Sequence, residues 1–319
     1  MGEATLFTWI GERWGYPIIV APPKTNNIHA TIRRFAKDEI RLLPIADTKM
    51  TSPDQTDYVL RGGDHGAERL RLLASVKWPT TKPLLDRAGM RPGLHCLDVG
   101  CGAGAVTFRM AEAVQPTGRV TGIDFDERCV GLARSEAQRL GLDVEFRTGS
   151  ATDLEDRSAY DLVFGRFLLT HLPEPETTLE GMVRAARPGG VVVVEDIQFT
   201  GHFSHPACPA FDRYVSLYQD VVRHKGGDPN IGPRLLGMFL DAGLADVELE
   251  VIQPSYREGP GKRIASVTME HIREAVVGAG LASDEEISGV VAEINSFADD
   301  PQTILSLPRI FQVCGKKPC

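Results

Sequence analysis

Runs typical of strands and segments with helical spacing follow one another along the middle of the chain. The strand-like runs are residues 119–124, 143–149, 160–166 and 191–197. The segments with a helical period of apolar residues are 106–114, 127–141 and 175–190. The last strand-like run, VVVVEDI, is apolar over most of its length, as expected for a strand buried on both faces. This order predicts an α/β fold with a parallel, doubly wound sheet.

Three long segments do not follow this alternation. They are residues 1–55, 198–230 and 255–307, of which the second carries aromatic and apolar residues at helical spacing and the third has candidate helices around 264–278 and 283–298. Around them we expect a core of residues 56–254 and 308–319, which includes a helix over 232–244 and strands over 246–254 and 309–317. Insertions of this length between strands are usually functional, so we expect 198–230 and 255–307 to form a helical lid.

The stretch CLDVGCGAGAVT, residues 96–107, has the order strand, glycine turn and helix start. Such a turn lets the backbone approach a nucleotide-like ligand closely. The Gly-x-Gly-x-x-Ala pattern from Gly100 fits a dinucleotide site. The alternative pattern places Asp98 before glycines at Gly100, Gly102 and Gly104, and resembles motif I of class I S-adenosylmethionine (SAM) methyltransferases.

Asp98 discriminates between these two ligands. A carboxylate just before the turn would repel an anionic pyrophosphate, which is bound by the amides of a helix terminus. SAM carries a cationic amino group and a sulfonium, which suit a nearby carboxylate. The sequence therefore favours SAM, and its product S-adenosylhomocysteine, over NAD(P).

From residue 56 to residue 318 the chain resembles bacterial class I SAM-dependent methyltransferases of small molecules, the "methyltransferase domain" group often labelled UbiE-like. Four blocks carry the resemblance: 56–73 before the core, RPGLHCLDVGCGAG at 91–104, GRFLLTHLPEPETTLEGMVRAARPGGVVVVED at 165–196, and 226–244. The resemblance implies a seven-stranded, Rossmann-like sheet and methyl transfer by in-line displacement at the sulfonium methyl.

The resemblance also assigns residues to the adenosine part of the cofactor. Asp124, at the end of a strand and 20 residues past Gly104, is expected to bind the ribose hydroxyls, with Phe125 beside the adenine. Where the group often has Gly-Asp-Ala, this chain has Ser150 and Ala151 after a glycine. Whether the neutral Ser150 or backbone groups hold the adenine stays open at this stage.

Three further residues are expected near the methionine part of SAM or the acceptor. Tyr58 and Arg69 precede the core and, by resemblance, close over the methionine end. Arg166 follows a strand whose carboxyl end faces the ligand crevice of an open α/β sheet. It is expected to line the cofactor or to contact an acidic substrate, with a structural salt bridge as the alternative.

A catalytic base is needed only where the acceptor atom carries a proton with a high pKa, since the leaving group is a neutral thioether. His171, in THLPEP, and Asp196, at the end of the fifth strand, are the candidates we favour. Glu195, His202 and His205 are the alternatives. No sequence pattern distinguishes between oxygen, nitrogen and carbon as the acceptor atom.

Composition and net charge limit the classes of partner that the protein is expected to bind. A net charge of −8 and no dense basic run argue against a nucleic acid, and no apolar run is long enough for a membrane span. The six cysteines form no C-x-x-C pair and no metal-ligand spacing, so we expect a cytoplasmic protein without a metal. We expect residues 1–55 to contribute to the lid, and we leave pairing into a homodimer open.

The function that these features predict is SAM-dependent methylation of a small, partly apolar molecule beneath the lid. Two other functions remain open from the residues alone. A protein that binds SAM or its product without turnover would fit the neutral Ser150 and the unmatched first segment. An NADP-linked oxidoreductase would fit the Gly-x-Gly-x-x-Ala pattern, although no Tyr-x-x-x-Lys pair is present to supply its base.

Overall fold

The computed structural model describes residues 63–319, and within them a seven-stranded sheet in the order β3-β2-β1-β4-β5-β10-β7. Strands β1 to β5 are parallel to one another, whereas β10 runs antiparallel to both β5 and β7. The strands are β1 (His95–Val99), β2 (Arg119–Asp124), β3 (Val144–Thr148), β4 (Tyr160–Arg166), β5 (Ala186–Gln198), β7 (Ala245–Ile252) and β10 (Arg309–Lys316). This confirms the predicted α/β fold with a Rossmann-like sheet.

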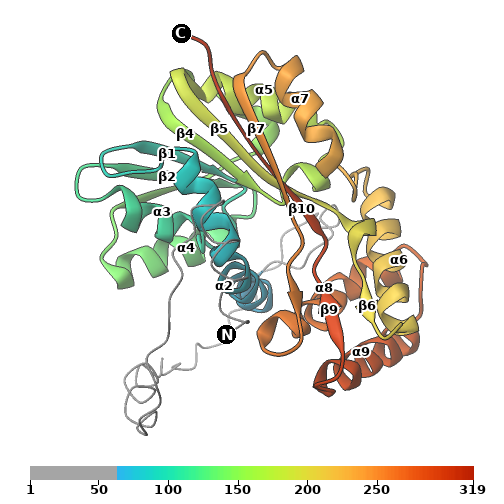
Figure 1. The fold of residues 1–319 in the computed structure, drawn as a ribbon. Helices are drawn as coiled ribbons and strands as arrows, with labels where there is room; N and C mark the ends of the chain where they lie inside the picture. The colour runs from blue at the N-terminus through green and yellow to red at the C-terminus, as the bar shows by residue number, and fades with distance from the viewer. Residues whose placement is uncertain (1–62) are drawn as a thin grey trace, which may run out of the picture. The chain divides into compact units, whose positions relative to one another are not determined.

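Helices cover both faces of the sheet (Figure 1). The elements of one face are α2 (Gly63–Arg87), α3 (Thr107–Val114) and α4 (Glu127–Leu140), and those of the other are α5 (Pro175–Ala185) and α7 (Leu235–Asp241). The strand order reverses between β1 and β4, and open α/β sheets bind ligands at the carboxyl ends of the strands beside such a reversal. The fold therefore directs attention to the residues that follow β1, β2, β4 and β5.

A separate group of helices, for which we keep the name lid, lies beyond the carboxyl ends of the parallel strands, at the lower right of Figure 1. It consists of α6 (Pro209–His224), α8 (Ile264–Gly278), α9 (Asp284–Asp299) and a small sheet of β6 (Ser204–His205), β9 (Ile304–Ser306) and β8 (Ser255–Tyr256). Side chains of the three helices share one hydrophobic cluster, in which Phe211, Met269 and Ile294 are fully buried. The lid thus has its own core, built from two segments that are far apart in the sequence.

Local sequence signals explain where α4 begins and ends. The side chain of Asp126 accepts a hydrogen bond from the backbone N–H of Arg128, at 2.9 Å, and so caps the first turn. The helix ends at Gly141, whose φ of +66° is the left-handed conformation that favours glycine. Because α4 follows directly after β2, these signals also fix the position of the loop around Asp124.

Most element boundaries lie close to the sequence patterns, with two exceptions: the end of α5, and the helix predicted over 232–244, of which α7 spans only Leu235–Asp241. Strands β2 and β4 and helix α8 span the predicted ranges 119–124, 160–166 and 264–278. The helix predicted over 175–190 is too long, since α5 ends at Ala185 and the next residues extend β5. Pro188 disfavours a helical conformation at the residue before it, and the pairing of β4 with β5 shifts register at this point.

Several expectations fall on residues outside the described part of the chain. These are the segment 1–55, including its place in a lid or a dimer, and Tyr58. Within residues 63–319, no helix is long and apolar enough to span a bilayer. All six cysteines are free thiols, and five of them are buried.

Candidate functional site

The loop after β1 turns through three glycines with left-handed φ angles, +72° at Gly100, +54° at Gly102 and +81° at Gly104. A Cβ atom at Gly104 would lie 2.7 Å from Phe108 and 2.9 Å from Phe146, closer than carbon atoms can approach. The loop therefore requires glycine there for both conformation and space. It brings the start of α3 and the carboxyl end of β2 against the same short stretch of backbone.

Asp124, at the end of β2, is tied to this glycine loop. Its carboxylate accepts hydrogen bonds from the backbone N–H groups of Gly102, at 2.8 Å, and Asp126, at 3.0 Å. Burial raises the pKa of Asp124, while these amide donors oppose the rise. Each carboxylate oxygen has two acceptor positions, so the carboxylate can also receive hydroxyl donors from a bound ribose.

Asp98, in β1, is the second acidic group of the loop, and it is buried. Its Oδ2 accepts a hydrogen bond of 2.6 Å from the Thr107 hydroxyl at the start of α3. Burial raises the pKa of Asp98 to about 6, an effect that this hydrogen bond and the charge of Arg166 oppose. A cation arriving next to Asp98 would remove part of the cost of its buried negative charge.

The residues expected around the adenine lie at the ends of β2 and β3. Phe125 is 54% exposed, although it is a large apolar side chain that directly follows Asp124. Ser150 is exposed as well, and its hydroxyl accepts from the backbone N–H of Thr152 at 3.2 Å, which caps a short 3₁₀ helix, η2 (Ala151–Asp153). Phe125 thus lies exposed directly after Asp124, whereas Ser150 has a local capping role.

Arg166, at the end of β4, joins a buried polar cluster that also includes Glu195 of β5 and Thr81 of α2. The guanidinium of Arg166 donates to the Thr81 hydroxyl at 3.3 Å, and this hydroxyl donates to Glu195 at 2.7 Å. Gln312 of β10 donates to the other oxygen of Glu195 at 3.1 Å. Burial lowers the pKa of Arg166, against the opposing charges of Glu195 and Asp98. Arg166 therefore lies between the carboxylate of the glycine loop and that of β5.

Asp196 and Glu195 are neighbours in β5 but point to opposite faces of the sheet, as successive strand residues do. The carboxylate of Asp196 accepts from the backbone N–H groups of Thr170, at 3.1 Å, and Ile197, at 2.9 Å. Burial raises the pKa of Asp196 to about 7. Asp196 thus holds the loop after β4, next to the short 3₁₀ helix η3 (Leu169–His171), in place.

The other predicted site residues are more dispersed. His171 is half-buried in η3, and a Cβ atom at Gly227 would lie 3.3 Å from its Cα, so the loop after α6 packs tightly against it. Arg69 lies in the first turns of α2, but its side chain is outside those that the structure describes. The structure therefore brings Asp98, Asp124 and Arg166 together and leaves His171 apart from them.

Sequence reasoning missed the contribution of α2, above all that of Lys77 and Thr81. Both residues are fully buried. The available signal was their spacing, because Lys77, Thr81 and Leu85 recur every four residues and so share one face of the helix. A lysine on the buried face of a helix is uncommon, so it marks a candidate functional group.

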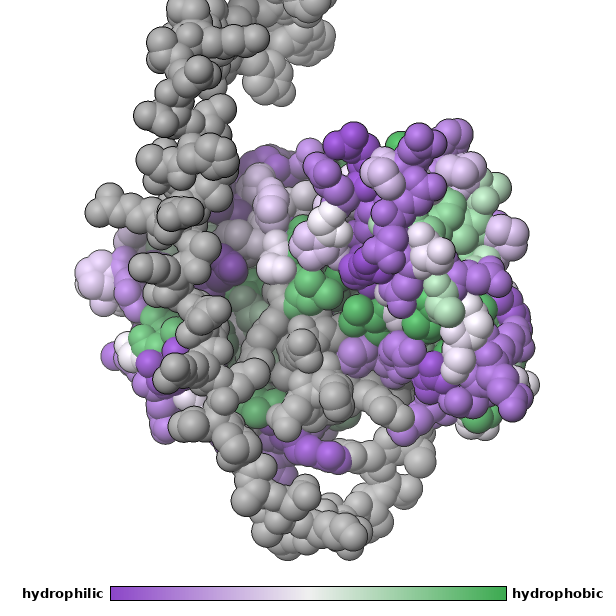
Figure 2. Space-filling view, turned by 90° about the horizontal axis from the view of Figure 1, so that it is seen from below, coloured by the Kyte–Doolittle hydropathy of each residue, from purple (hydrophilic) through white to green (hydrophobic). Residues whose placement is uncertain are grey.

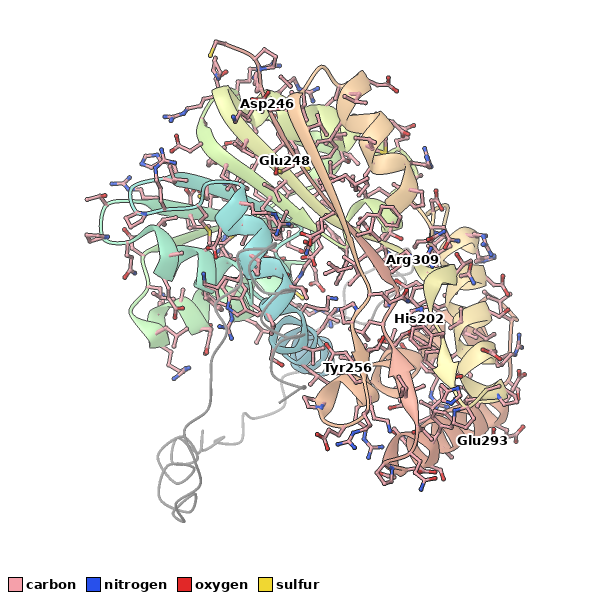
Figure 3. All side chains as sticks on the ribbon, viewed as in Figure 1. His202, Asp246, Glu248, Tyr256, Glu293 and Arg309 are labelled. Carbon is pink, nitrogen blue, oxygen red and sulfur yellow. The ribbon has the colours of Figure 1, made fainter. Side chains whose placement is uncertain are left out.

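The lid contributes aromatic rings to the same region. His202 packs against Phe199, with ring centroids 4.3 Å apart, and Phe199 stacks on Tyr218 at 3.7 Å. Figure 3 shows His202 on the lid side beside β10 and Tyr256 near α2, while Asp246 and Glu248 lie at the far end of β7. In the view from below, patches of apolar residues lie among hydrophilic residues near the middle of the described surface (Figure 2).

No group of three or more His, Cys, Asp or Glu residues within 63–319 is arranged to hold a metal ion. The donor set around the glycine loop suits an organic cation instead. A buried carboxylate, a half-buried carboxylate, an exposed aromatic ring and a glycine turn match the amino, sulfonium, adenine and ribose parts of SAM. The residues present therefore fit this cofactor.

Comparisons with known proteins agree with this geometry. Residues 90–225 match a family model described as a methyltransferase domain. Demethylmenaquinone methyltransferase from Staphylococcus aureus is 35% identical over 182 residues, which cover 56% of this chain and 72% of that protein. A protein from Bacillus halodurans C-125 that carries a provisional methyltransferase name has a similar fold, with a TM-score of 0.52 at 19% identity, covering 76% of this chain and 100% of that one.

The fold and the motif define a class I SAM-dependent methyltransferase. Within this class, the chain belongs to the UbiE-like methyltransferase family. The predicted enzyme class and the predicted cofactor, SAM, are thereby confirmed.

Proposed function

We propose that this methyltransferase binds SAM along the glycine loop and methylates a small, partly apolar molecule held between α2, the ends of β4 and β5, and the lid. In this arrangement Asp124 binds the ribose hydroxyls, Phe125 flanks the adenine and Asp98 lies near the methionine end. The single observation that supports it most is the pair of carboxylates, Asp98 buried and Asp124 partly buried, on either side of a left-handed glycine turn.

The protein's part in the reaction is to position the acceptor and to exclude water. When bound, SAM supplies an electrophilic methyl group and leaves as a neutral thioether. In-line displacement then depends mainly on the alignment of the acceptor atom with the methyl carbon and the sulfur. The aromatic residues of the lid and the buried cluster of Arg166, Glu195 and Thr81 are suited to hold the acceptor in a dry environment.

The side-chain roles in catalysis follow from the same geometry. The hydrogen bonds of Asp196 to backbone amides favour a positioning role, since its carboxylate holds the loop that carries His171. Glu195 is the acidic group of β5 that lies on the side of α2 and Arg166. We therefore place Glu195 next to the acceptor and assign His171 to the loop that borders it.

Calorimetry with SAM tests the cofactor arrangement. Asp98→Ala and Asp124→Ala are each expected to weaken SAM binding roughly 10- to 100-fold, the range for a hydrogen bond to a charged group. Asp241→Ala serves as the control, because Asp241 is exposed on α7, on the other face of the sheet. Wild-type affinity in both loop variants would reject the proposed arrangement.

A panel of small aromatic and aliphatic acceptors, incubated with the full chain and methyl-labelled SAM, tests turnover. Transfer of label to any acceptor supports the enzyme mechanism. Tight SAM binding without transfer across a broad panel would favour the alternative of a binding protein.

A further inference from the structure

Lys77 is a fully buried lysine whose ammonium has no hydrogen-bond partner among the residues that the structure describes. The contrast with Lys262, at 2% exposure, shows how unusual this is. The ammonium of Lys262 donates to the carbonyl oxygens of Asp300 and Thr303 and to the Thr303 hydroxyl, at 2.8 to 3.1 Å. Lys262 has the hydrogen bonds of a structural lysine, whereas Lys77 retains all three of its donors.

The positive charge of Lys77 is not fully balanced by the charges around it. Burial lowers the pKa of Lys77 to about 8, Glu195 opposes this change, and Arg166 adds to it. Glu195 already accepts hydrogen bonds from Thr81 and Gln312, one on each oxygen. Two cations, Lys77 and Arg166, therefore share the single negative charge of Glu195, and neither of its hydrogen bonds comes from Lys77.

Among the residues that the structure describes, no acidic group of the lid contributes to the pKa of Lys77. His202 lies on the lid side, and burial, together with the charge of Lys77, lowers the pKa of His202 to about 3. The imidazole is therefore neutral near pH 7, and its Nδ1 lies 2.9 Å from the carbonyl oxygen of Phe199. Beyond it lie the rings of Phe199, Phe211 and Tyr214. Lys77 thus shares one carboxylate, Glu195, with a second cation, Arg166, on the sheet side, and has aromatic rings on the lid side.

We propose that Lys77, with Arg166 beside it, binds an anionic oxygen of the methyl acceptor, so that the acceptor combines an apolar body with a carboxylate or phenolate group. An unpaired ammonium in a buried site is costly, and an incoming anion removes that cost when it replaces the missing partner. The aromatic rings of the lid would contact the apolar body. This inference rests on the proposed function, because it needs the acceptor to lie between α2 and the lid.

The binding test uses the full chain saturated with S-adenosylhomocysteine and four probes. Benzoate represents a carboxylate, 4-nitrophenolate represents a phenolate, and benzamide and nitrobenzene are their uncharged counterparts. Lys77→Met removes the charge at similar length, and Lys82→Met is the matched control, since Lys82 is an exposed residue of α2 paired with Asp86. We expect wild type and Lys82→Met to bind one anion more tightly than its uncharged counterpart, and Lys77→Met to bind that anion roughly 30-fold more weakly or worse.

The affinity for S-adenosylhomocysteine separates this inference from the cofactor arrangement. It should stay within about threefold of wild type in Lys77→Met, unlike in Asp98→Ala and Asp124→Ala. The anion that binds identifies the group, carboxylate or phenolate. If the wild-type protein does not prefer either anion to its uncharged counterpart, or if Lys77→Met keeps that preference, the inference is wrong.

Thermal unfolding of the protein without ligands gives a second, independent readout. Lys77→Met should melt at the same temperature as wild type or higher, because it removes an unpaired buried charge. Lys262→Met should melt lower, because it leaves buried carbonyl acceptors unpaired. A fall in melting temperature for Lys77→Met as large as that for Lys262→Met would show a structural lysine and overturn the inference.

Discussion

The site has a cofactor half, around the glycine loop, and an acceptor half, around Glu195. The hydrogen bonds within each half join residues at very different separations along the chain. In the cofactor half, Asp98 is bonded to Thr107, nine residues away, and Asp124 to Gly102, 22 residues away. In the acceptor half, Glu195 is bonded to Thr81 across 114 residues and to Gln312 across 117. The cofactor half is therefore one continuous local motif, whereas the acceptor half exists only after α2, β5 and β10 have packed together.

This difference separates the consequences of substitutions. Changes in the cofactor half should alter SAM binding with modest effects on the acceptor half. Changes in the acceptor half should alter methyl transfer and stability while SAM binding persists. Four predictions test this separation.

The largest combined effect, on stability and on methyl transfer together, is expected from Gly104→Ala. The new methyl group meets Phe108 and Phe146 at 2.7 and 2.9 Å, and the left-handed φ of +81° adds backbone strain. We expect a loss of about 2–3 kcal/mol in the free energy of unfolding and methyl transfer roughly 100-fold slower. Denaturant unfolding and a methyl-transfer assay measure the two effects.

Gly243→Ala is the control for this strain. Gly243 also has a left-handed φ, +76°, but no atom lies within 4 Å of the position of its Cβ. It should cost about 1 kcal/mol of stability and leave SAM binding unchanged. Equal SAM binding by both variants would contradict the assignment of the loop.

Glu195→Gln should have the next largest effect, in the acceptor half. It leaves the charges of Lys77 and Arg166 without their nearest carboxylate, so we expect a loss of about 3 kcal/mol in stability. Calorimetry should find SAM binding nearly unchanged. The double variant with Lys77→Met should recover part of the lost stability, and strictly additive losses would show that the two groups are not coupled.

A smaller effect is expected from pH on the cofactor half. The pKa of Asp98 is about 6, so lowering the pH below about 6 protonates it and removes the attraction for a cationic ligand. SAM affinity should stay constant just above this range and fall below it by at most about tenfold per pH unit. Calorimetry between pH 5 and pH 7 measures the profile, and Asp98→Asn should make it flat. A profile that is identical in the variant would contradict the role of Asp98.

A second effect of pH concerns the lid, and it acts on stability rather than on SAM binding. The pKa of His202 is about 3 in the folded protein and near 6.5 when unfolded, so the unfolded chain gains a proton as the pH falls through 6.5. This contribution lowers stability by at most about 1.4 kcal/mol per pH unit between those values. Asp98 and Asp196, whose pKa values are raised, act in the opposite direction between their unfolded and folded values.

Comparison with His202→Phe isolates the contribution of this residue. The stability difference between wild type and the variant should shift in favour of the variant as the pH falls from 6.5 to 4. Urea unfolding at several pH values measures it. A difference that does not change with pH would show that His202 is not kept neutral by its burial.

The contrast between local and distant contacts also explains what the sequence could predict. The glycine turn, Asp98 and Asp124 form a pattern within about 30 residues, and strand β2 has the predicted bounds because its signals are local. The role of α2 was missed because nothing near Lys77 in the sequence indicates that Glu195, more than a hundred residues later, lies beside it. The face of the sheet to which Asp196 points could not be predicted either, because it depends on which helices cover each face.

The lid shows the same limit at the level of whole elements. Its three helices could be predicted from their own periodicity, and α8 has the predicted bounds. The packing of α6 against α8 and α9 could not be predicted. The small sheet that joins residues 204–205, 255–256 and 304–306 could not be predicted either. Strands of two or three residues carry too little pattern to be recognised without their partners.

The shared core of the lid has a consequence for how this enzyme family can diversify. Phe211 of α6 and Met269 of α8 belong to one packed cluster, although they come from two separate insertions into the sheet. A change of side-chain volume in one insertion creates a cavity or a clash that only the other can relieve. The two insertions should therefore covary among homologous sequences, so that evolution exchanges them as a pair while the glycine loop stays the same.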